Sequence, residues 1–453
     1  MIFDYMKYIE KIIEYGLYLL AFLLPLQTRW IIKPGEINGG YFEYGTISLY
    51  GTDILLVIIV LLYGYVVIKR GDWKIKVKNS KFIYWALIAL LDITIFVSIF
   101  FAFDKILALY RYGLFLIGIG LFWLMMNANY KKIKLIWSFL IGIFLQASLG
   151  IWQFLFQSSF ACKWLGLASH NSTESGVSVV EAVASDGIGE RWLRAYGGVD
   201  HPNILGGILA VGLLLVIYLY FYNIESNLKK KLELKSFVIH FLFFIFALAL
   251  FFTFSRGAWI GFAFAILIIL FYTILKKNLI QQKKILEIIF ALSILTFILF
   301  SQYGYLVSTR FSNSSRLEKK STNERIEFIL EAKNIIKENW LFGVGIGNYG
   351  MAVEEKRPNS NTWDYQPAHN VFFLIWAEIG VIGFLTYFAI LIYAIWLSIK
   401  NTNNIGLPLL SVLVIIMIVD HWLWSLHFGI LFFWIMIGLI IKNANFDKQE
   451  LTN

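Results

Sequence analysis

The sequence has little charge and almost no cysteine. Charged residues make up 15% of its 453 residues and hydrophobic residues 59%, whereas a soluble globular domain has roughly 25% charged residues. Together with a mean hydropathy of +0.70, this composition favours a membrane protein over a chain of several soluble domains. Cys162 stands alone, which excludes an internal disulfide and a cysteine metal cluster and leaves the redox compartment open.

Apolar stretches long enough to cross a bilayer recur along the chain, and no strand-like alternation competes with them. A bilayer core about 30 Å thick needs roughly 20 apolar residues per helix. We therefore predict an all-α polytopic membrane protein with about 12 transmembrane helices. The stretches cover residues 11–27, 53–69, 82–101, 107–126, 133–155, 203–222, 236–254, 257–275, 284–301, 370–397, 405–420 and 424–441. The first is expected to stay as a helix, because no small-residue cleavage site follows it.

Lysine and arginine gather in every second loop, and such short basic loops face the cytoplasm. These residues are Arg70, Lys74, Lys76, Lys78, Lys81, Lys131, Lys132, Lys134, Lys229, Lys230, Lys231, Lys235, Lys276, Lys277, Lys283, Lys284 and Lys400. The net charge of +10 thus reflects membrane topology first, and no nucleic-acid partner is expected. We predict a single membrane domain over residues 1–453 with both termini cytoplasmic. Two long loops, 156–202 and 302–369, then lie outside.

The predicted spans contain little charge of their own. Asp92 lies within a span, while Asp53, Glu378 and Asp420 lie near span ends. A secondary transporter is expected to carry ionisable residues or broken helices near the bilayer midplane. The unusual polar residues of this chain instead crowd the outer ends of spans and the long outer loops. This distribution favours chemistry at the outer surface over transport.

Arg256 stands at a tight junction between two spans, in the segment from Phe254 to Trp259. One interpretation is a snorkelling arginine that ends a helix, with Gly257 in the turn. A turn this short needs no guanidinium, however, and the outer side is not where topology places positive charge. The other interpretation is that Arg256 holds phosphate oxygens at the level of the lipid headgroups.

Residues 321–340 are predicted to form an amphipathic helix in the second long outer loop. Ser321 and Glu324 have the spacing of a capping box at its start. At 100° per residue, one face carries Ile329, Ala332, Ile336 and Trp340, and the other carries Glu327, Glu331, Asn334 and Glu338. Arg325 falls on the apolar side, so it either swings free at a frayed first turn or presents its charge inward to a negative ligand.

His369 lies in Pro367-Ala368-His369-Asn370 at the start of the tenth span. A lone histidine at a span end is often a capping or hydrogen-bonding residue. Its ordinary pKa of about 6.5 also lets it accept a proton near neutral pH. Transfer from a phosphate-linked donor requires a general base beside a phosphate clamp, and His369 is the candidate for that base.

The segment from Arg194 to Asn203 precedes the sixth span and contains a turn marked by paired glycines and Pro202. For Asp200, His201 and Asn203 a structural role is at least as consistent as a ligand contact. Arg194 is the better candidate, because it would add a third guanidinium to the outer face.

Other motifs point away from cofactors. The glycines from Gly343 to Asn348 lack the spacing of a dinucleotide loop and follow no predicted strand, so we predict a tight turn there. His421 and His427 have no carboxylate or thiolate companion at metal-ligand spacing. The sequence also contains no H-E-x-x-H motif, no Walker loop and no clustered outer carboxylates. We therefore expect a mechanism without metal, cofactor or direct use of ATP.

In this order, these segments resemble the O-antigen ligase and polymerase superfamily of bacterial envelope glycosyltransferases, and the resemblance spans most of the chain. Its most specific parts are Ser255 to Trp259, Arg325 with the run from Asn339 to Tyr349, and His369-Asn370 with Glu378 and Gly380. The segment from Arg194 to Asn203 resembles the family's Arg-Gly-Pro-Asn segment. Around Asn339 the family usually has a proline, which this chain lacks.

The resemblance implies a GT-C-like helical fold in the bacterial cytoplasmic (inner) membrane and a reaction on its outer face. The donor would be a glycan linked to undecaprenyl pyrophosphate, and part of the active site would lie in the large periplasmic loop 302–369. The implied roles are general base for His369, pyrophosphate binding for Arg256, Arg325 and Arg194, and support for Asn370, Glu378 and Asn203.

Several functions remain open within this resemblance. A ligase passes glycan to lipid A core, a polymerase of O-antigen or capsule uses a second lipid-linked glycan as acceptor, and other members glycosylate proteins. We favour the ligase type, because the motif set is complete and the main outer loop is long. A lipid or solute transporter is the alternative from another class, and the scarcity of charge within the spans disfavours it.

Overall fold

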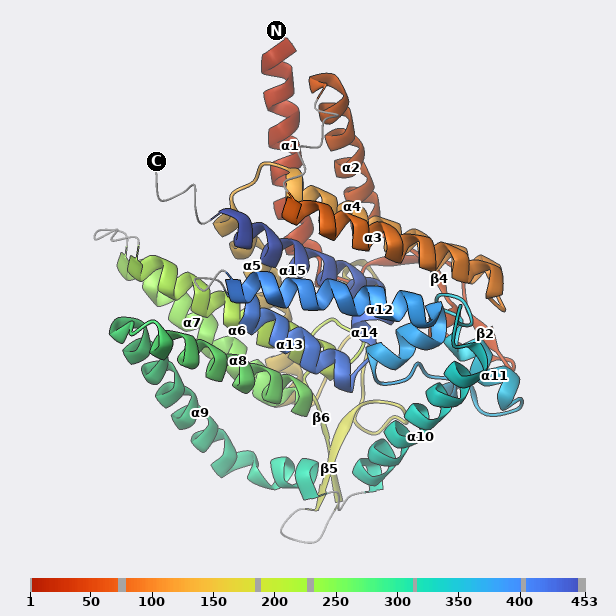
Figure 1. The fold of residues 1–453 in the computed structure, drawn as a ribbon. Coiled ribbons are helices and arrows are strands. Elements are labelled where there is room, and N and C mark those ends of the chain that lie inside the picture. Colours follow the sequence, from red (N-terminus) through yellow and green to blue (C-terminus); the bar gives the residue numbers. More distant parts are fainter. Residues whose placement is uncertain are drawn as a thin grey trace.

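The structure is a computed structural model that describes residues 2–71, 79–183, 189–225, 232–312, 316–400 and 405–446. Six of the basic loop residues lie outside these ranges, namely Lys74, Lys76, Lys78, Lys229, Lys230 and Lys231. Figure 1 shows a bundle of helices, with two further helices and a β-hairpin extending from one side of it.

Each of the twelve predicted stretches overlaps one helix over most of its length. These helices are α1 (Ile2–Leu23), α2 (Gly51–Arg70), α3 (Asn79–Ser98), α4 (Lys105–Asn127), α5 (Lys132–Phe156), α6 (Pro202–Glu225), α7 (Leu232–Phe252), α8 (Arg256–Leu275), α9 (Leu279–Ser312), α12 (Val371–Lys400), α13 (Gly406–Val419) and α15 (His427–Phe446). Eight helices among the described residues are long and apolar enough to cross a membrane, and three shorter apolar helices accompany them. The predicted all-α polytopic fold is confirmed, while the number of helices that cross the membrane stays a prediction.

The centre of the bundle is α6, a helix that is apolar on every side. It packs against α5, α7, α8 and α13, and Leu205, Leu209 and Leu213 along it are completely buried. A helix with no polar face is stable only when other helices surround it. The position of α6 brings its first residues, which follow Arg194, to the start of α8 and the end of α13.

Short strands and helices form in the loops that the sequence analysis predicts to lie outside. Three antiparallel pairs join β1 (Arg29–Lys33) to β4 (Ile47–Tyr50), β2 (Glu36–Ile37) to β3 (Gly40–Tyr41), and β5 (Val179–Val183) to β6 (Gly189–Leu193). The remaining helices are α10 (Arg316–Asn339), α11 (Tyr349–Lys356) and α14 (Trp422–Ser425). In Figure 1, α9 and α10 diverge from the bundle, and the β5–β6 hairpin lies between their lower ends.

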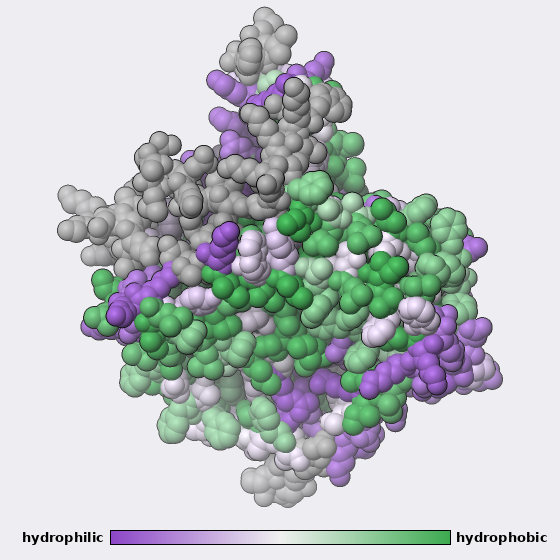
Figure 2. All heavy atoms as spheres, in the orientation of Figure 1, coloured by the Kyte–Doolittle hydropathy of each residue, from purple (hydrophilic) through white to green (hydrophobic). Residues whose placement is uncertain are grey.

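The amphipathic helix of the large loop differs from its prediction in start and in face. It begins at Arg316, so Ser321 and Glu324 lie inside it and the predicted capping box is wrong. Its buried residues are Glu318, Phe328, Ala332, Ile335 and Ile336, whereas Trp340 is 55% exposed. Figure 2 shows hydrophilic side chains around α10 and α11, beside the hydrophobic surface of the bundle.

Helix α12 is interrupted at Gly380, and the glycine-rich turn provides hydrogen-bond donors for the backbone carbonyls that the interruption leaves unpaired. Gly380 has φ 73° and ψ −179°, which frees backbone groups that the membrane interior cannot solvate. Val344 and Gly345 donate hydrogen bonds to the carbonyls of Ala377 and Glu378, both at 2.9 Å. Gly343, Gly345 and Gly347 all have positive φ, so the predicted tight turn is confirmed.

Candidate active site

His369 and Asp420 face one another where α12 begins and α13 ends. The Nδ1 atom of His369 lies 3.8 Å from Oδ1 of Asp420. Asn370 brings the two ends together, because its Nδ2 donates to the carbonyl of Ile418 at 3.0 Å. Its Oδ1 accepts hydrogen bonds from the amides of Phe372 and Phe373 and so caps α12. Asn370 thus has a structural contact that positions His369.

Asp420 is held as a buried carboxylate. Its Oδ2 accepts a hydrogen bond from Asn203 Nδ2 at 3.0 Å, and its Oδ1 accepts one from the His421 amide at 2.8 Å. Burial opposes ionisation, but the contact with His369 and the nearby histidines outweigh it and hold the pKa of Asp420 well below its usual range. The ionised Asp420 can therefore orient His369 and stabilise its protonated form.

His421 lies against the same pair in a neutral state. Its Nδ1 is 2.6 Å from Ser425 Oγ, and its Nε2 is 3.5 Å from the hydroxyl of Tyr44. Burial, and next the charge of His369, lower the pKa of His421 to about 3. At neutral pH this imidazole is uncharged, so it can hydrogen bond without competing for the proton of His369.

The sequence-based statement that His421 and His427 lack companions is wrong. His369, Asp420 and His421 bring one candidate ligand atom each within 4.8 Å of one another, and His427 Nε2 lies 2.6 Å from Asp53 Oδ1. Asp420 directly precedes His421 in the sequence, whereas His369 and Asp53 come from distant segments, which no local spacing reveals. The oxygens of Asp420 and both ring nitrogens of His421 already face protein groups, an arrangement that fits a hydrogen-bonded network better than a metal-ligand set.

Arg194 is fully engaged with the protein. Its Nε donates to the carbonyl of Thr253 at 2.7 Å, Nη1 to Ser178 Oγ at 2.6 Å and Nη2 to Asn203 Oδ1 at 2.9 Å. The side chain is buried, and burial, together with the positive charge of Arg310, lowers its pKa. Through Asn203 it is linked to Asp420, so the observed contacts suit a positioning role more than direct ligand contact.

Arg256 and Arg310 bind each other's backbone segments where α8 begins and α9 ends. Nη1 of Arg256 donates to the carbonyl of Arg310 at 2.5 Å, and Nη2 of Arg310 donates to the carbonyl of Phe254 at 3.2 Å. Glu318, from the first turn of α10, pairs with both guanidinium groups. The predicted Arg256 therefore lies in a cluster that also contains Arg310 and Glu318, neither of which the sequence analysis singled out.

Arg325 adds a fourth guanidinium to this region. It follows Glu318 by seven residues and therefore lies on the same face of α10, the face that contains Ala332. Its charge interacts with Asp420 and Arg256. On the same helix, the ring of Phe328 lies 5.7 Å from that of His369. Helix α10 thus brings Arg325 toward the histidine.

Glu378 lines a cavity whose wall does not include His369. Its Oε2 accepts a hydrogen bond from Trp424 Nε1 at 2.7 Å. The cavity is also lined by Arg111, Tyr44, Tyr349 and Ser425. Because Tyr44 and Ser425 contact His421, this cavity adjoins the candidate site.

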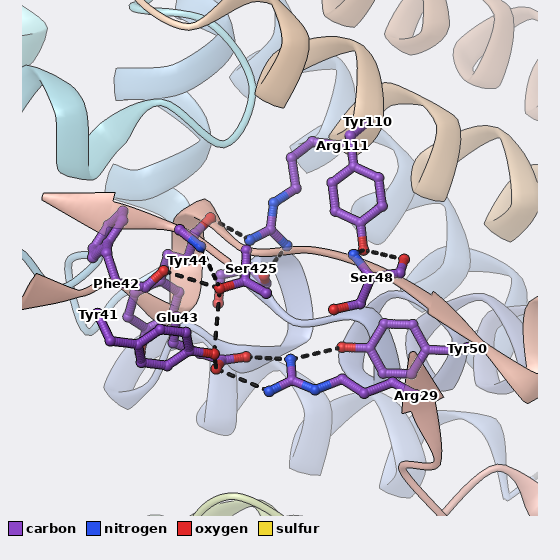
Figure 3. A network of polar contacts seen from close by, with 12 residues as sticks. Arg29, Tyr41, Phe42, Glu43, Tyr44, Ser48, Tyr50, Tyr110, Arg111 and Ser425 are labelled. Atoms are coloured by element: carbon purple, nitrogen blue, oxygen red, sulfur yellow. Dashed lines mark hydrogen bonds and ion pairs between the residues drawn. The ribbon is translucent and has the colours of Figure 1, made fainter. Parts of the chain in front are cut away.

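The segment between α1 and α2 also reaches the site through Tyr44, although its sequence carried no recognised motif. Arg111 positions it, because Nη2 donates to the carbonyl of Tyr44 at 2.6 Å and Nη1 to that of Ser425 at 2.8 Å. Nearby, Arg29 holds Glu43 through two hydrogen bonds. Figure 3 shows these groups converging around Tyr44 and Ser425. Of the groups that meet His369, the sequence singled out Asp420 as a charge near a span end, Asn370 as its neighbour and Arg325 as an arginine on an apolar helix face.

The fold and the site define a polytopic helical membrane protein with arginine and histidine side chains gathered at the ends of its helices. Residues 241–388 match the family model described as O-Antigen ligase. This match includes Arg256, Arg310, Arg325 and His369. The resemblance to the O-antigen ligase and polymerase superfamily, inferred from the sequence, is confirmed.

Two curated proteins are similar to this chain. An uncharacterized protein of Haemophilus influenzae (strain ATCC 51907 / DSM 11121 / KW20 / Rd) is 30% identical over 182 residues, which cover 37% of this chain and 45% of that protein. A protein named O-antigen polymerase from Salmonella muenchen is 27% identical over 261 residues, covering 57% of this chain and 58% of that protein. The chain thus spans about half the length of the curated relatives it matches.

Proposed function

We propose that this protein is a glycosyltransferase of the O-antigen ligase type, which transfers a glycan from undecaprenyl pyrophosphate to a sugar hydroxyl of lipid A core. The observation that carries the proposal is the His369–Asp420 pair beside a cluster of arginines at the outer helix ends. The family match over residues 241–388 supports the same chemistry. The basic loops, which are the even-numbered ones that follow the second, fourth, sixth, eighth and tenth predicted spans, support an active site on the opposite, outer face of the bacterial inner membrane.

The proposed reaction is a direct displacement at the anomeric carbon. The acceptor oxygen forms the new bond to this carbon, the bond from the carbon to the phosphate oxygen breaks, and undecaprenyl pyrophosphate leaves. His369 accepts the proton of the attacking hydroxyl. Because Nδ1 of His369 faces Asp420, Nε2 is the nitrogen available for that proton. Asp420 stabilises the imidazolium, and Arg256 and Arg325 stabilise the charge on the leaving pyrophosphate.

A polymerase is the second candidate, and one specific observation favours it. The relative from Salmonella muenchen that covers 57% of this chain carries the name O-antigen polymerase. A polymerase would use the same donor chemistry, but its acceptor would be a second lipid-linked glycan. The two candidates therefore differ in the acceptor and in the products.

The test supplies purified protein with lipid-linked repeat units, with and without lipid A core, and resolves the products by size. Product formed only with core supports the ligase, and a ladder of lengthened glycans without core supports the polymerase. The reaction is expected to continue in the presence of EDTA, since the proposed steps use only protein side chains. Absence of product under both conditions would contradict the proposal.

A further inference from the structure

Glu318 is a buried carboxylate held between two arginines. Its side chain is 4% exposed, Oε1 pairs with Nη1 of Arg310, and Oε2 lies 3.3 Å from Nη2 of Arg256. Burying a carboxylate is costly unless cations and hydrogen-bond donors compensate it. The contacts with both arginines provide that compensation, so Glu318 acts as the counterion of the pair.

The arginine pair offers more positive charge than one carboxylate neutralises. The side chain of Arg310 is 9% exposed, and its Nε has no hydrogen-bond partner among the described residues. Arg256 keeps 25% of its side chain exposed. The charges of Arg194 and Arg325 also act on Arg310 and Arg256. The cluster can therefore accept an anion of higher charge than Glu318.

We propose that Arg310 and Arg256 together bind one phosphate of a prenyl-linked diphosphate, and that Glu318 occupies this position until the diphosphate displaces it. A carboxylate and a phosphate both offer two oxygens to the fork of a guanidinium group. This inference rests on the proposed function, which supplies the diphosphate as ligand. In this inference Arg310 binds phosphate, and the carboxylate of Glu318 occupies the phosphate position while no ligand is bound.

Displacement follows from the charges. A diphosphate bound next to an ionised and buried Glu318 would be repelled, and so the carboxylate must leave the arginines when the ligand enters. Glu318 lies in the first turn of α10, next to the exposed Lys319 and Lys320, so its side chain has a short path to water. Before the ligand binds, the Glu318 carboxylate provides the counterion that the two arginines need in this buried position.

Binding of geranyl pyrophosphate to the purified full-length protein in detergent tests the inference by calorimetry. In the wild type the ligand has to displace the charge-assisted hydrogen bonds between Glu318 and the two arginines, and Glu318→Gln lacks these bonds. This variant should therefore bind geranyl pyrophosphate roughly tenfold more tightly than the wild type. Glu327→Gln is the matched control: it removes the same charge from an exposed position of α10 and should change the affinity by less than about twofold.

Arginine variants distinguish a failure of the roles assigned to Glu318 and Arg310 from a failure of the proposed function. Arg256→Lys and Arg310→Lys keep the charge but lose the fork, and each should weaken binding by roughly tenfold or more. If Arg256→Lys weakens binding but Glu318→Gln binds no more tightly than wild type, only the role of Glu318 is overturned. If Arg310→Lys alone binds as wild type does, the assignment of Arg310 is overturned. If the wild type does not bind the ligand, or if both arginine variants bind it unchanged, the proposed function itself is contradicted.

A measurement on the wild type covers the case in which Glu318→Gln does not fold. Ligand binding usually slows amide exchange in the contacting segments, but displacement of Glu318 removes a tertiary contact from the first turn of α10. Hydrogen exchange in peptides covering residues 316–324 should therefore become faster when geranyl pyrophosphate is added. Unchanged or slower exchange in these peptides, at saturating ligand, would overturn the displacement.

Discussion

His369 and His421 have the same side chain but opposite surroundings. His369 faces the ionised Asp420, whereas His421 is buried between Ser425 and Tyr44 with a pKa of about 3. Asp420 acts on both rings, but at His421 burial and the charge of His369 outweigh it and favour the neutral form. The different neighbours of the two histidines therefore suit them to different roles.

The first prediction concerns activity at this pair. His369→Gln should reduce glycan transfer by about 10² to 10⁴, the usual cost of removing a catalytic base, with unchanged yield of folded protein. Asp420→Asn should also impair transfer, because the amide no longer stabilises the imidazolium. The measurement is product formed per minute from a lipid-linked donor. Normal transfer by His369→Gln would contradict the assignment of the base.

The second prediction concerns pH. The pKa of His421 is about 3 in the folded protein, below the ordinary value of about 6.5 for an unfolded chain. Between these values only the unfolded state takes up the proton, so acid should destabilise the protein, by up to about 1.4 kcal/mol per pH unit from this residue. Thermal unfolding in detergent from pH 7 to pH 4 measures this slope.

His421→Gln is the variant for that measurement, since glutamine does not titrate. Its stability should fall less steeply with acid than that of the wild type. A variant that loses stability as steeply as the wild type would show that His421 does not contribute to the pH dependence.

At the scale of elements, the important feature is the interruption of α12. A left-handed residue in the middle of a span would normally leave backbone groups unpaired. Here the turn from Gly343 to Gly347 supplies the missing partners for Ala377 and Glu378, and Val381 donates to the carbonyl of Trp340 at 2.9 Å. The turn and the break form one unit that positions His369 at the start of α12.

The third prediction tests this unit. A Cβ atom at Gly380 would meet the backbone of Leu341 and Phe342, and φ of 73° is unfavourable for alanine. Gly380→Ala should therefore lower stability by about 2 kcal/mol or more, measured as thermal unfolding in detergent. Gly113→Ala is the control, because the space around Gly113 in α4 is open. Equal stability of the two variants would contradict this account of the break.

At the scale of the whole molecule, the distribution of lysine and arginine predicts which ends of the helices face outward. The candidate site lies where α8, α9, α12 and α13 end or begin, on the side opposite the basic even-numbered loops. Arginines at this side have no role in orienting the chain. The proposed chemistry therefore requires the outer loops, including the one that contains Cys162, to be outside the cytoplasm.

The fourth prediction uses Cys162, the single cysteine, as a reporter of this orientation. A maleimide that cannot cross membranes should label Cys162 in spheroplasts without permeabilisation. In the double variant Cys162→Ser, Lys131→Cys, the thiol lies in an even-numbered loop and should be labelled only after permeabilisation. Labelling with the opposite pattern would reverse the predicted topology.

The sequence predicted well what depends on neighbours along the chain. All twelve apolar stretches are helices, because length and hydrophobicity are local properties. The glycine turn at Gly343 was predicted for the same reason. The start of α10 was predicted wrongly, since the residues from Arg316 onward continue the helix and the spacing of Ser321 and Glu324 is found equally within a helix.

What the sequence determined by itself is therefore the class of protein, the helical segments and the presence of His369 and the arginines at helix ends. Only the tertiary structure decided which of these groups meet. Asp420 reaches His369 from another helix, Glu318 joins Arg256 to Arg310 across two helix ends, and Arg194 contacts Asn203 and Thr253. The physical reason is that hydrophobicity along a chain specifies each helix separately, whereas the pairing of buried charges depends on how the helices pack.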